Sequence, residues 1–455
     1  MAIETINPST GKKIRTHDLM SYEQLGEIVE KAEAAYQLWR HTDFAERSIP
    51  MIKAATKLEA NKNAYAQLMA EEMGKPLAQG IGEIEKCARV CRYYAEYAEG
   101  FLKSEMISTD ATKSYVRFQP LGIILAIMPW NFPFWQVFRF AAPALMAGNA
   151  ALLKHAPNVT GCALAVEELM EKAGFPQNLF RALIIDNDQA SFVIKHPLIK
   201  AVTLTGSTRA GRAVASLAGS VLKKTVLELG GSDPYVILED ADLAKTVQTC
   251  VASRMINGGQ SCIAAKRFIV PVSLKERFEA LCVEHMRSYK MGDPFKEGVQ
   301  LGPLARFDLR DTLHGQVTRS RERGARLLLG GEIPKREGAF YPPTVLTNVT
   351  KGMPAYEEEL FGPVAAIIKV KNEEEAMTVA NDSNYGLGAA VFTKNVEKGE
   401  RMAAEYLEAG CCFVNDFVRS DPRLPFGGVK ESGFGRELSV FGLREFVNIK
   451  TVYVG

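Results

Sequence analysis

The sequence predicts an α/β fold built from two domains, each formed around a parallel β-sheet. Three observations lead to this fold class. The chain has 455 residues, which is more than a single hydrophobic core usually holds. From about residue 121 onward, short apolar runs alternate with stretches of helical periodicity, as they do in βαβ units. The apolar runs are continuous rather than alternating with polar residues, which is typical of strands covered on both faces.

The expected elements follow in chain order. Ala, Glu, Lys and Leu recur at helical spacing between residues 20 and 104, which predicts a helical N-terminal part. Buried strands of a first sheet come next, at 121–129, 149–156, 181–186, 201–206 and 224–230, with helices such as 161–174 and 209–219 between them. A second set follows Gly231, at 234–239, 266–271, 363–370, 388–393 and 411–416. Two exposed strands, 113–120 and 446–455, are expected to pair outside either core.

The stretch from Leu121 to Gly148 needs a separate interpretation, because its length and apolar character would suit a bilayer span. Its single charge is Arg139, and three prolines, Asn131 and Gln136 interrupt it. We therefore expect a buried strand, a turn and a buried helix, and no membrane association. An arginine in such surroundings needs either a partner acid or a function.

Composition argues against several function classes. With 55 basic and 53 acidic residues the formal net charge is +2, so nucleic acid is not an expected partner. The eight cysteines are scattered, no CxxC occurs, and the six histidines are isolated, so no metal site is predicted. Free thiols are typical of a reducing compartment, and the N-terminal residues show no targeting signal. The expected location is therefore the cytoplasm.

Three polar residues in unusual positions are candidates for chemistry. Cys262 follows two glycines in the segment NGGQSCIAAK, so it is either a buried thiol or a nucleophile presented by a tight loop. Glu228 ends an apolar strand, where a carboxylate either binds backbone N–H groups or acts as a base with a raised pKa. Asn131 lies between two prolines and either caps a turn or donates to an oxyanion.

A strand-to-helix turn in TLTGSTRAG places Gly206 and Ser207 at a helix N-terminus. Backbone N–H groups at such a turn suit a phosphate, although the turn alone would also explain the glycine. The GxGxxG fingerprint of dinucleotide-binding domains is absent. Glu359 precedes a turn, where the residues alone favour a solvated acid. No residue taken by itself decides the function.

Six motifs in one order are more informative than any single residue: PWNFP at 129–133, GSTRAG at 206–211, ELGG at 228–231, GQSC at 259–262, ExFGP at 359–363 and PFGGVKESGFGRE at 425–437. In order and spacing they resemble the aldehyde dehydrogenase superfamily over the whole chain. The resemblance implies a Rossmann-type cofactor-binding domain (1–104 and 121–231), a second α/β catalytic domain (232–440) and a small oligomerisation hairpin (105–120 and 441–455). It also implies a homodimer or homotetramer.

The resemblance implies a role for each catalytic candidate. Cys262 would be the nucleophile that attacks an aldehyde carbon, while Asn131 and the backbone N–H of Cys262 would hold the developing oxyanion. The thiohemiacetal would pass hydride to a nicotinamide and leave a thioester. Glu228 would then activate the water that hydrolyses the thioester.

The resemblance also implies contacts to a bound NADP or NAD. The residues that match such contacts, or flank them, are Trp130, Lys154, His155, Pro157, Gly206, Ser207, Leu229, Glu359 and Phe361. Pro157 stands where many NAD-preferring members have a glutamate that binds the ribose hydroxyls. The carboxylate that would repel a 2′-phosphate is therefore missing, and both cofactors stay open.

Arg139 and Ser420 match substrate contacts of bacterial NAD(P)-dependent succinate-semialdehyde dehydrogenases, which the chain resembles further. The expected substrate is a small aldehyde whose terminal carboxylate Arg139 would clamp. A second arginine found in some members is replaced by Ile256, and a structural Arg139 paired with an unseen acid stays open. The alternatives are a general aliphatic aldehyde dehydrogenase and a cysteine-dependent hydrolase. A hydrolase would use Cys262 together with a nearby histidine, but none of the six motifs contains a histidine.

Overall fold

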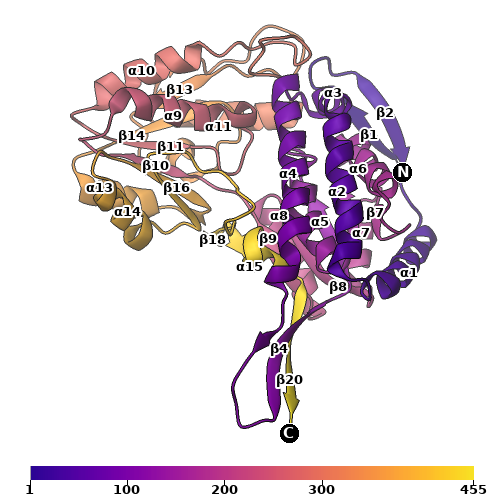
Figure 1. Ribbon diagram of the computed structural model, residues 1–455. Helices are drawn as coiled ribbons and strands as arrows, with labels where there is room; N and C mark the ends of the chain where they lie inside the picture. Colours follow the sequence, from indigo (N-terminus) through magenta and orange to yellow (C-terminus); the bar gives the residue numbers. More distant parts are fainter. Residues whose placement is uncertain (1) are drawn as a thin grey trace.

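The computed structural model describes residues 2–455 and contains two large sheets with helices packed against them, and an arm that projects from the body (Figure 1). The first sheet has the strand order β19-β9-β8-β5-β6-β7, and all of its strands are parallel except the short β19. Its strands are β5 (Ile123–Met128), β6 (Ala150–His155), β7 (Phe180–Ala182), β8 (Ile199–Thr205), β9 (Lys224–Glu228) and β19 (Gly433–Phe434).

The chain order of the first sheet reverses between β5 and β8, which are direct neighbours. Parallel strands end at the same edge, so the loops that follow these two strands diverge there and leave a crevice. This reversal positions the candidate site, because the segments 129–131 and 206–207 follow the two strands directly.

Helices of the N-terminal half surround the first sheet, and Figure 1 shows α2 and α4 lying side by side. A capping box at Ser21 starts the first of them, and α5 is buried along its whole length, as its apolar sequence requires. The helices are α1 (Tyr22–Trp39), α2 (Phe44–Ala60), α3 (Lys62–Met73), α4 (Leu77–Phe101), α5 (Trp135–Met146), η1 (Pro157–Val159), α6 (Thr160–Ala173), α7 (Asn187–Lys195) and α8 (Thr208–Ser220).

The second sheet has seven strands in the order β12-β13-β14-β11-β10-β16-β17, parallel except for the β12–β13 pair. They are β10 (Pro234–Ile237), β11 (Arg267–Pro271), β12 (Arg326–Leu329), β13 (Thr344–Thr347), β14 (Val364–Val370), β16 (Gly388–Phe392) and β17 (Cys411–Val414). The helices of this part are α9 (Leu243–Met255), η2 (Ile256–Gly259), α10 (Lys275–Arg287), α11 (Phe307–Glu322), α12 (Pro354–Glu357), α13 (Glu373–Asn381), α14 (Val396–Arg401) and η3 (Met402–Tyr406).

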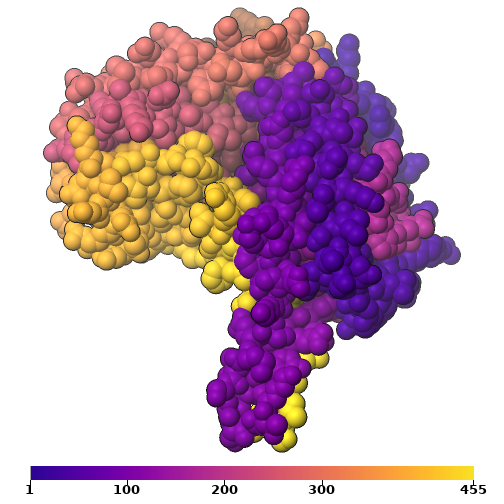
Figure 2. All heavy atoms as spheres, in the orientation of Figure 1, coloured from indigo at the N-terminus to yellow at the C-terminus, as the bar shows by residue number. Residues whose placement is uncertain are grey.

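The arm is a separate three-stranded antiparallel sheet of β20 (Val447–Val454), β4 (Lys113–Pro120) and β3 (Glu105–Met106). Figure 2 shows it standing clear of the body, with the C-terminal strand beside the β4 segment. The short helix α15 (Ser439–Arg444) precedes β20 and packs against α4 and α5.

The predicted α/β class is confirmed, and each predicted strand of the two sheets is present. The stretch 121–148 forms a strand, a turn and a buried helix, and no helix within residues 2–455 is long and apolar enough to cross a membrane. The sequence did not predict the N-terminal hairpin β1 (Ala2–Ile6) and β2 (Lys13–Asp18), the β12–β13 pair, or the small pair β15 (Tyr385–Gly386) and β18 (Val429–Lys430). It also did not place β19 in the first sheet.

Candidate active site

A cavity of about 350 Å³ brings most of the sequence-predicted site residues together at the crevice of the first sheet. Eight of them line it, together with Pro129, Thr205, Gly230, Leu309 and Thr312: Trp130, Asn131, Gly206, Ser207, Leu229, Cys262, Glu359 and Phe361. The loops after β5, β8 and β9 supply one wall, and Cys262 and the 359–361 segment come from the second half of the chain. Five motifs far apart in the sequence therefore meet in one cavity.

The loop before Cys262 has a backbone that explains its glycines. Asn257, Gly258 and Gly259 all have positive φ, at 53°, 62° and 76°. A Cβ on Gly259 would lie 2.2 Å from the carbonyl oxygen of Gly362, so only glycine fits there. This tight packing fixes the turn that presents Cys262, whose side chain is partly exposed to the cavity.

The Cys262 thiol lies in surroundings that hold it protonated. Burial raises its pKa to about 12, against the opposing charges of Arg139 and Lys266. The nucleophile of this chemistry is the thiolate, so attack requires that the proton leave as the carbon–sulfur bond forms. Among the eight cysteines only Cys262 and Cys412 are not fully buried, and Cys412 does not line the cavity.

Asn131 is oriented so that its amide can donate into the cavity. One hydrogen of Nδ2 is used by the carbonyl oxygen of Gln260 at 3.0 Å, which leaves the second hydrogen for a substrate oxygen. The backbone carbonyl of Asn131 accepts from Lys75 Nζ at 2.9 Å and from Asn257 Nδ2 at 2.7 Å. Two donors thus hold the Asn131 backbone on both sides, and the arrangement suits stabilisation of a developing oxyanion.

Lys75 and Glu83 form a buried ion pair beneath the PWNFP segment. Glu83 Oε1 also accepts from the backbone N–H groups of Phe134 and Trp135, each at 2.9 Å, at the start of α5. The pair thereby ties α4 to both ends of the turn that carries Asn131. Sequence reasoning missed these residues, since a lysine and a glutamate among helical residues give no signal of burial.

Glu228 lies buried at the end of β9, and neither carboxylate oxygen has a hydrogen-bond partner among residues 2–455. Burial raises its pKa well above the usual range, and the nearby Glu437 raises it further. Arg139 acts in the opposite direction. An unpaired carboxyl with a raised pKa binds a proton more readily than an ordinary one, which suits a general base.

Arg139 is paired with an acidic residue, a possibility that the sequence left open. Its guanidinium forms a buried ion pair with Glu437, and its Nη2 donates to Thr205 Oγ1 at 3.3 Å. The ring of Phe426 lies 4.8 Å from the guanidinium carbon. Arg139 pairs with Glu437, its charge also acts on Glu228, and its side chain does not line the cavity.

The cavity walls fit a dinucleotide. Ser207 is the N-cap of α8, its Oγ accepting from Ala210 N at 3.3 Å, so this helix N-terminus opens at the cavity. The rings of Trp130 and Phe361 meet edge to face with centroids 5.6 Å apart and form an apolar wall. A polar group, Glu359, lines the same space.

Glu359 is held in place by neighbours that the sequence did not single out. Its Oε1 accepts from Gly231 N at 3.0 Å and lies 3.5 Å from Lys266 Nζ. Lys266 also donates to the Cys262 carbonyl at 2.7 Å, so one buried ammonium links the two loops. This fixes the Glu359 carboxylate at a set distance from the Cys262 turn.

The three residues expected at the adenosine end differ in their surroundings. Lys154 is buried near the end of β6, and Pro157 is exposed and lines a separate hollow with Asn158. His155, which the resemblance placed among the residues that contact or flank the cofactor, has its ring nitrogens engaged within the chain. Burial lowers its pKa to about 4, its Nε2 lies 2.9 Å from the Pro133 carbonyl, and its Nδ1 accepts from Ala156 N at 2.9 Å. A neutral ring with both nitrogens engaged supports the PWNFP turn instead.

A family model described as "Aldehyde dehydrogenase family" matches residues 1–452. The chain belongs to this family. A "probable succinate-semialdehyde dehydrogenase" (NADP+) of Synechocystis is 49% identical over 100% of both chains. The succinate semialdehyde dehydrogenase (NAD(P)+) Sad of Escherichia coli is 48% identical over 99% of this chain and 97% of that one. The crystal structure of succinic semialdehyde dehydrogenase from Streptococcus pyogenes with NADP+ superimposes with a TM-score of 0.97, at 40% identity and full coverage of both chains.

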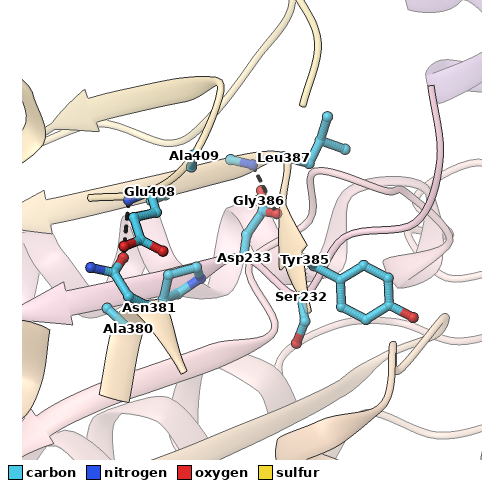
Figure 3. A pocket seen from close by; sticks show the side chains of 12 residues that line it. Ser232, Asp233, Ala380, Asn381, Tyr385, Gly386, Leu387, Glu408 and Ala409 are labelled. Carbon is cyan, nitrogen blue, oxygen red and sulfur yellow. Dashed lines mark hydrogen bonds between the residues drawn. The ribbon is translucent and has the colours of Figure 1, made fainter. Parts of the chain in front are cut away.

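This aldehyde dehydrogenase has a second, small polar pocket, whose residues hold the second sheet together. Figure 3 shows Asp233 beside Gly386 and Leu387, and Tyr385 and Glu408 also line this pocket. Asp233 Oδ1 accepts from Gly388 N at 3.1 Å, and a Cβ on Gly388 would lie 2.3 Å from Oδ2. Burial raises the pKa of Asp233 to about 6, but the space of about 10 Å³ holds no more than a water-sized group. The carboxylate ties β10 to the start of β16.

Proposed function

We propose that this aldehyde dehydrogenase oxidises succinate semialdehyde to succinate with NADP+ or NAD+. The observation that carries the chemistry is the position of Cys262 in a cavity that also holds the Asn131 amide, with Glu228 close enough to influence the thiol. The choice of substrate is supported by the full-length relatives that bear this name, and by the match of Arg139 and Ser420 to substrate contacts.

The proposed reaction uses each residue for one task. Cys262 Sγ attacks the aldehyde carbon as its proton leaves, and the oxygen that becomes negative accepts hydrogen bonds from Asn131 Nδ2 and the Cys262 backbone N–H. Trp130, Glu359 and Phe361 would hold NADP+ or NAD+ in the cavity, and the bound cofactor would supply the hydride acceptor that this carbon needs. The thioester that remains is hydrolysed by a water whose proton Glu228 takes, which releases the acid and frees the thiol. One aldehyde, one water and one oxidised cofactor thus give one carboxylic acid, one reduced cofactor and one proton.

The domain roles follow from this assignment. The first sheet and its helices would bind the cofactor at the crevice, and the second half of the chain would supply Cys262 and Glu359. The arm would serve assembly between copies of the chain. At the adenosine end Pro157 offers no carboxylate to meet the ribose hydroxyls, so we propose that NADP+ is accepted at least as readily as NAD+.

The test is a steady-state comparison of succinate semialdehyde with butyraldehyde, each with NADP+ and with NAD+. The proposal expects a much higher kcat/KM for the semialdehyde, and equal values would indicate a general aliphatic aldehyde dehydrogenase. Cys262→Ala should abolish formation of reduced cofactor, whereas Cys412→Ala, a change at the other partly exposed thiol, should leave it intact. Ester hydrolysis that proceeds without cofactor as fast as aldehyde oxidation would favour a hydrolase.

A further inference from the structure

Lys266 lies at the end of the turn that follows Cys262 and directly before β11. Its backbone N–H donates to the carbonyl of Asp233 at 3.1 Å, and its side chain is 1% exposed. This side chain folds back onto the turn, where Nζ donates to three carbonyl oxygens: Ser261 at 3.1 Å, Cys262 at 2.7 Å and Ala264 at 3.2 Å. An ammonium has three hydrogens, so the turn that carries the nucleophile uses all of them.

The hydrogen bond to Ser261 determines where one N–H group points. The peptide unit between Ser261 and Cys262 is trans, so its C=O and N–H groups point in opposite directions. Because Lys266 holds the carbonyl oxygen, the N–H of Cys262 faces away from the ammonium. That N–H has no acceptor among residues 2–455, so it is available to a substrate oxygen. The positive charge at the carbonyl also polarises the peptide unit, which makes its N–H a stronger donor.

Lys266 does not line the cavity, but it contacts two residues that do. Its Nζ donates to the carbonyl of Cys262 and lies 3.5 Å from Glu359 Oε1. Its charge also has an effect on the thiol: burial raises the pKa of Cys262 to about 12, and the charges of Arg139 and Lys266 act against this rise. Loss of Lys266 would therefore affect the reaction in two ways, through the direction of the Cys262 N–H and through the thiol, and these must be measured separately.

We propose that Lys266 is a positioning residue for the oxyanion-binding site. It holds the Ser261–Cys262 peptide so that the Cys262 N–H donates to the substrate oxygen together with the amide of Asn131. This rests on the proposed function, whose chemistry at Cys262 it deepens by naming the residue that orients the second oxyanion donor. Without the ammonium, three carbonyls lose their donor and the peptide is free to turn. The effect concerns the reacting oxygen, so it should be the same for every aldehyde.

The experiment compares Lys266→Met with Arg267→Met, a matched removal of the neighbouring cation. Arg267 is also 1% exposed, and its guanidinium also donates to three backbone carbonyls, but all three lie outside the Cys262 turn. Thermal stability and two rates are measured for each variant. The first rate is hydride transfer in the first turnover, with succinate semialdehyde and with butyraldehyde. The second is alkylation of Cys262 by iodoacetamide, which needs the thiol but develops no oxyanion.

Lys266→Met should slow hydride transfer about 100-fold for both aldehydes, as loss of one oxyanion donor does. The aldehyde concentration that gives half of the maximal rate should change by less than about threefold, because the lost interaction is made in the transition state. Alkylation should slow by less than about tenfold, since only the charge near the thiol is lost. Arg267→Met should keep both rates within about threefold of the wild type, even if its thermal stability falls as far as that of Lys266→Met.

Three results would overturn the inference. Equal losses of hydride transfer and alkylation in Lys266→Met would show that Lys266 acts only through the thiol, and unchanged rates would show that it is structural. The same selective loss in Arg267→Met would show that the effect does not depend on the Cys262 turn. If Lys266→Met does not fold, Lys266→Gln takes its place and the same outcomes decide, because its amide is polar but neutral and has only two hydrogens to donate.

The substrate proposal can fail separately. If the wild-type enzyme oxidises butyraldehyde as readily as succinate semialdehyde, the choice of substrate is wrong, but the role of Lys266 is still tested by hydride transfer from either aldehyde.

Discussion

Glu228 illustrates how surroundings set the task of one residue. Its carboxyl has no hydrogen-bond partner among the described residues, and burial together with Glu437 raises its pKa. A carboxyl with a raised pKa keeps its proton to a higher pH than usual and gains its basic form as pH rises. The step that needs a base, hydrolysis of the thioester, should therefore become faster with increasing pH.

Glu228→Gln tests this directly, because the amide keeps the shape but cannot take a proton. We expect a first turnover close to one reduced cofactor per Cys262, followed by steady-state turnover about 100-fold slower or more. The pH dependence of the slow phase should also be lost. Rapid-mixing absorbance measurements of the reduced cofactor at several pH values provide the check. Disappearance of the initial burst would show that Glu228 is needed before hydrolysis.

Pro157 is the residue on which the cofactor proposal depends. It is the exposed first residue of η1, separated from the end of β6 by one residue, and it stands where many NAD-preferring members of the family have a glutamate. A glutamate there would accept from the ribose hydroxyls of NAD and repel the roughly doubly negative 2′-phosphate of NADP. Pro157→Glu should therefore lower the ratio of kcat/KM with NADP to kcat/KM with NAD by about tenfold.

Pro157→Ser is the control, since it removes the proline ring without adding charge. Its cofactor ratio should stay near that of the wild type. The same ratio in the serine and glutamate variants would mean that charge at this position does not control cofactor choice.

At the residue scale the sequence predicted which residues meet but not what holds them. Motif residues such as Asn131 and Cys262 were recognisable because their local backbone requirements leave prolines and glycines beside them. The ion-pair partners were not recognisable, because Glu437 lies far from Arg139 in the sequence and contacts it only in the folded chain. The charged state of a buried group depends on such partners, so the role of Arg139 could not be assigned from the sequence.

Elements were predictable where a strand is covered on both faces. The inner strands β5, β8 and β10 read as continuous apolar runs because nearly every side chain is buried. Most of the missed strands lie at edges or are very short; β13 is an inner, buried strand, but its sequence TVLT alternates threonine with apolar residues and gives no continuous apolar run. β2 has the sequence KIRTHD with mostly exposed side chains, and β12 is only partly buried, so neither has the apolar pattern of an inner strand.

The start of α4 shows an element acting on the site from outside it. Lys75 precedes the helix and Glu83 lies in its second turn, and together they contact the carbonyl of Asn131 and the first N–H groups of α5. A buried ion pair of this kind contributes little net stability, but removing one partner leaves an uncompensated charge. Its evident consequence is the fixed position of the Asn131 turn. Lys86, on the next turn of the same helix, donates to Ser420 Oγ at 2.6 Å and so connects α4 to the loop that carries this serine.

At the scale of the whole molecule, the arm is the part whose exposed apolar surface has no partner within the body. Its strand β20 pairs only with β4, and its apolar side chains are exposed: Met106 at 64%, Ile449 at 63% and Tyr453 at 55%. Exposed apolar side chains gathered on a projecting sheet are typical of a surface that another chain covers. We propose that the arm joins copies of the chain into a homodimer or homotetramer, as expected from the sequence.

Ile449→Asp is the variant that tests the assembly. Side chains alternate along a strand, so Ile449 and Tyr453 share one face of β20 while Asn448 lies on the other. An aspartate at Ile449 would replace the burial of an isoleucine, worth about 1.5–3 kcal/mol, with the cost of desolvating a charge. Asn448→Asp adds the same charge to the opposite face and serves as the control. The wild type and Asn448→Asp should show a mass that is a multiple of 50.0 kDa by light scattering, and Ile449→Asp should approach 50.0 kDa itself. A monomeric wild type, or an Ile449→Asp variant that keeps the larger mass, would show that this face of the arm does not join the copies.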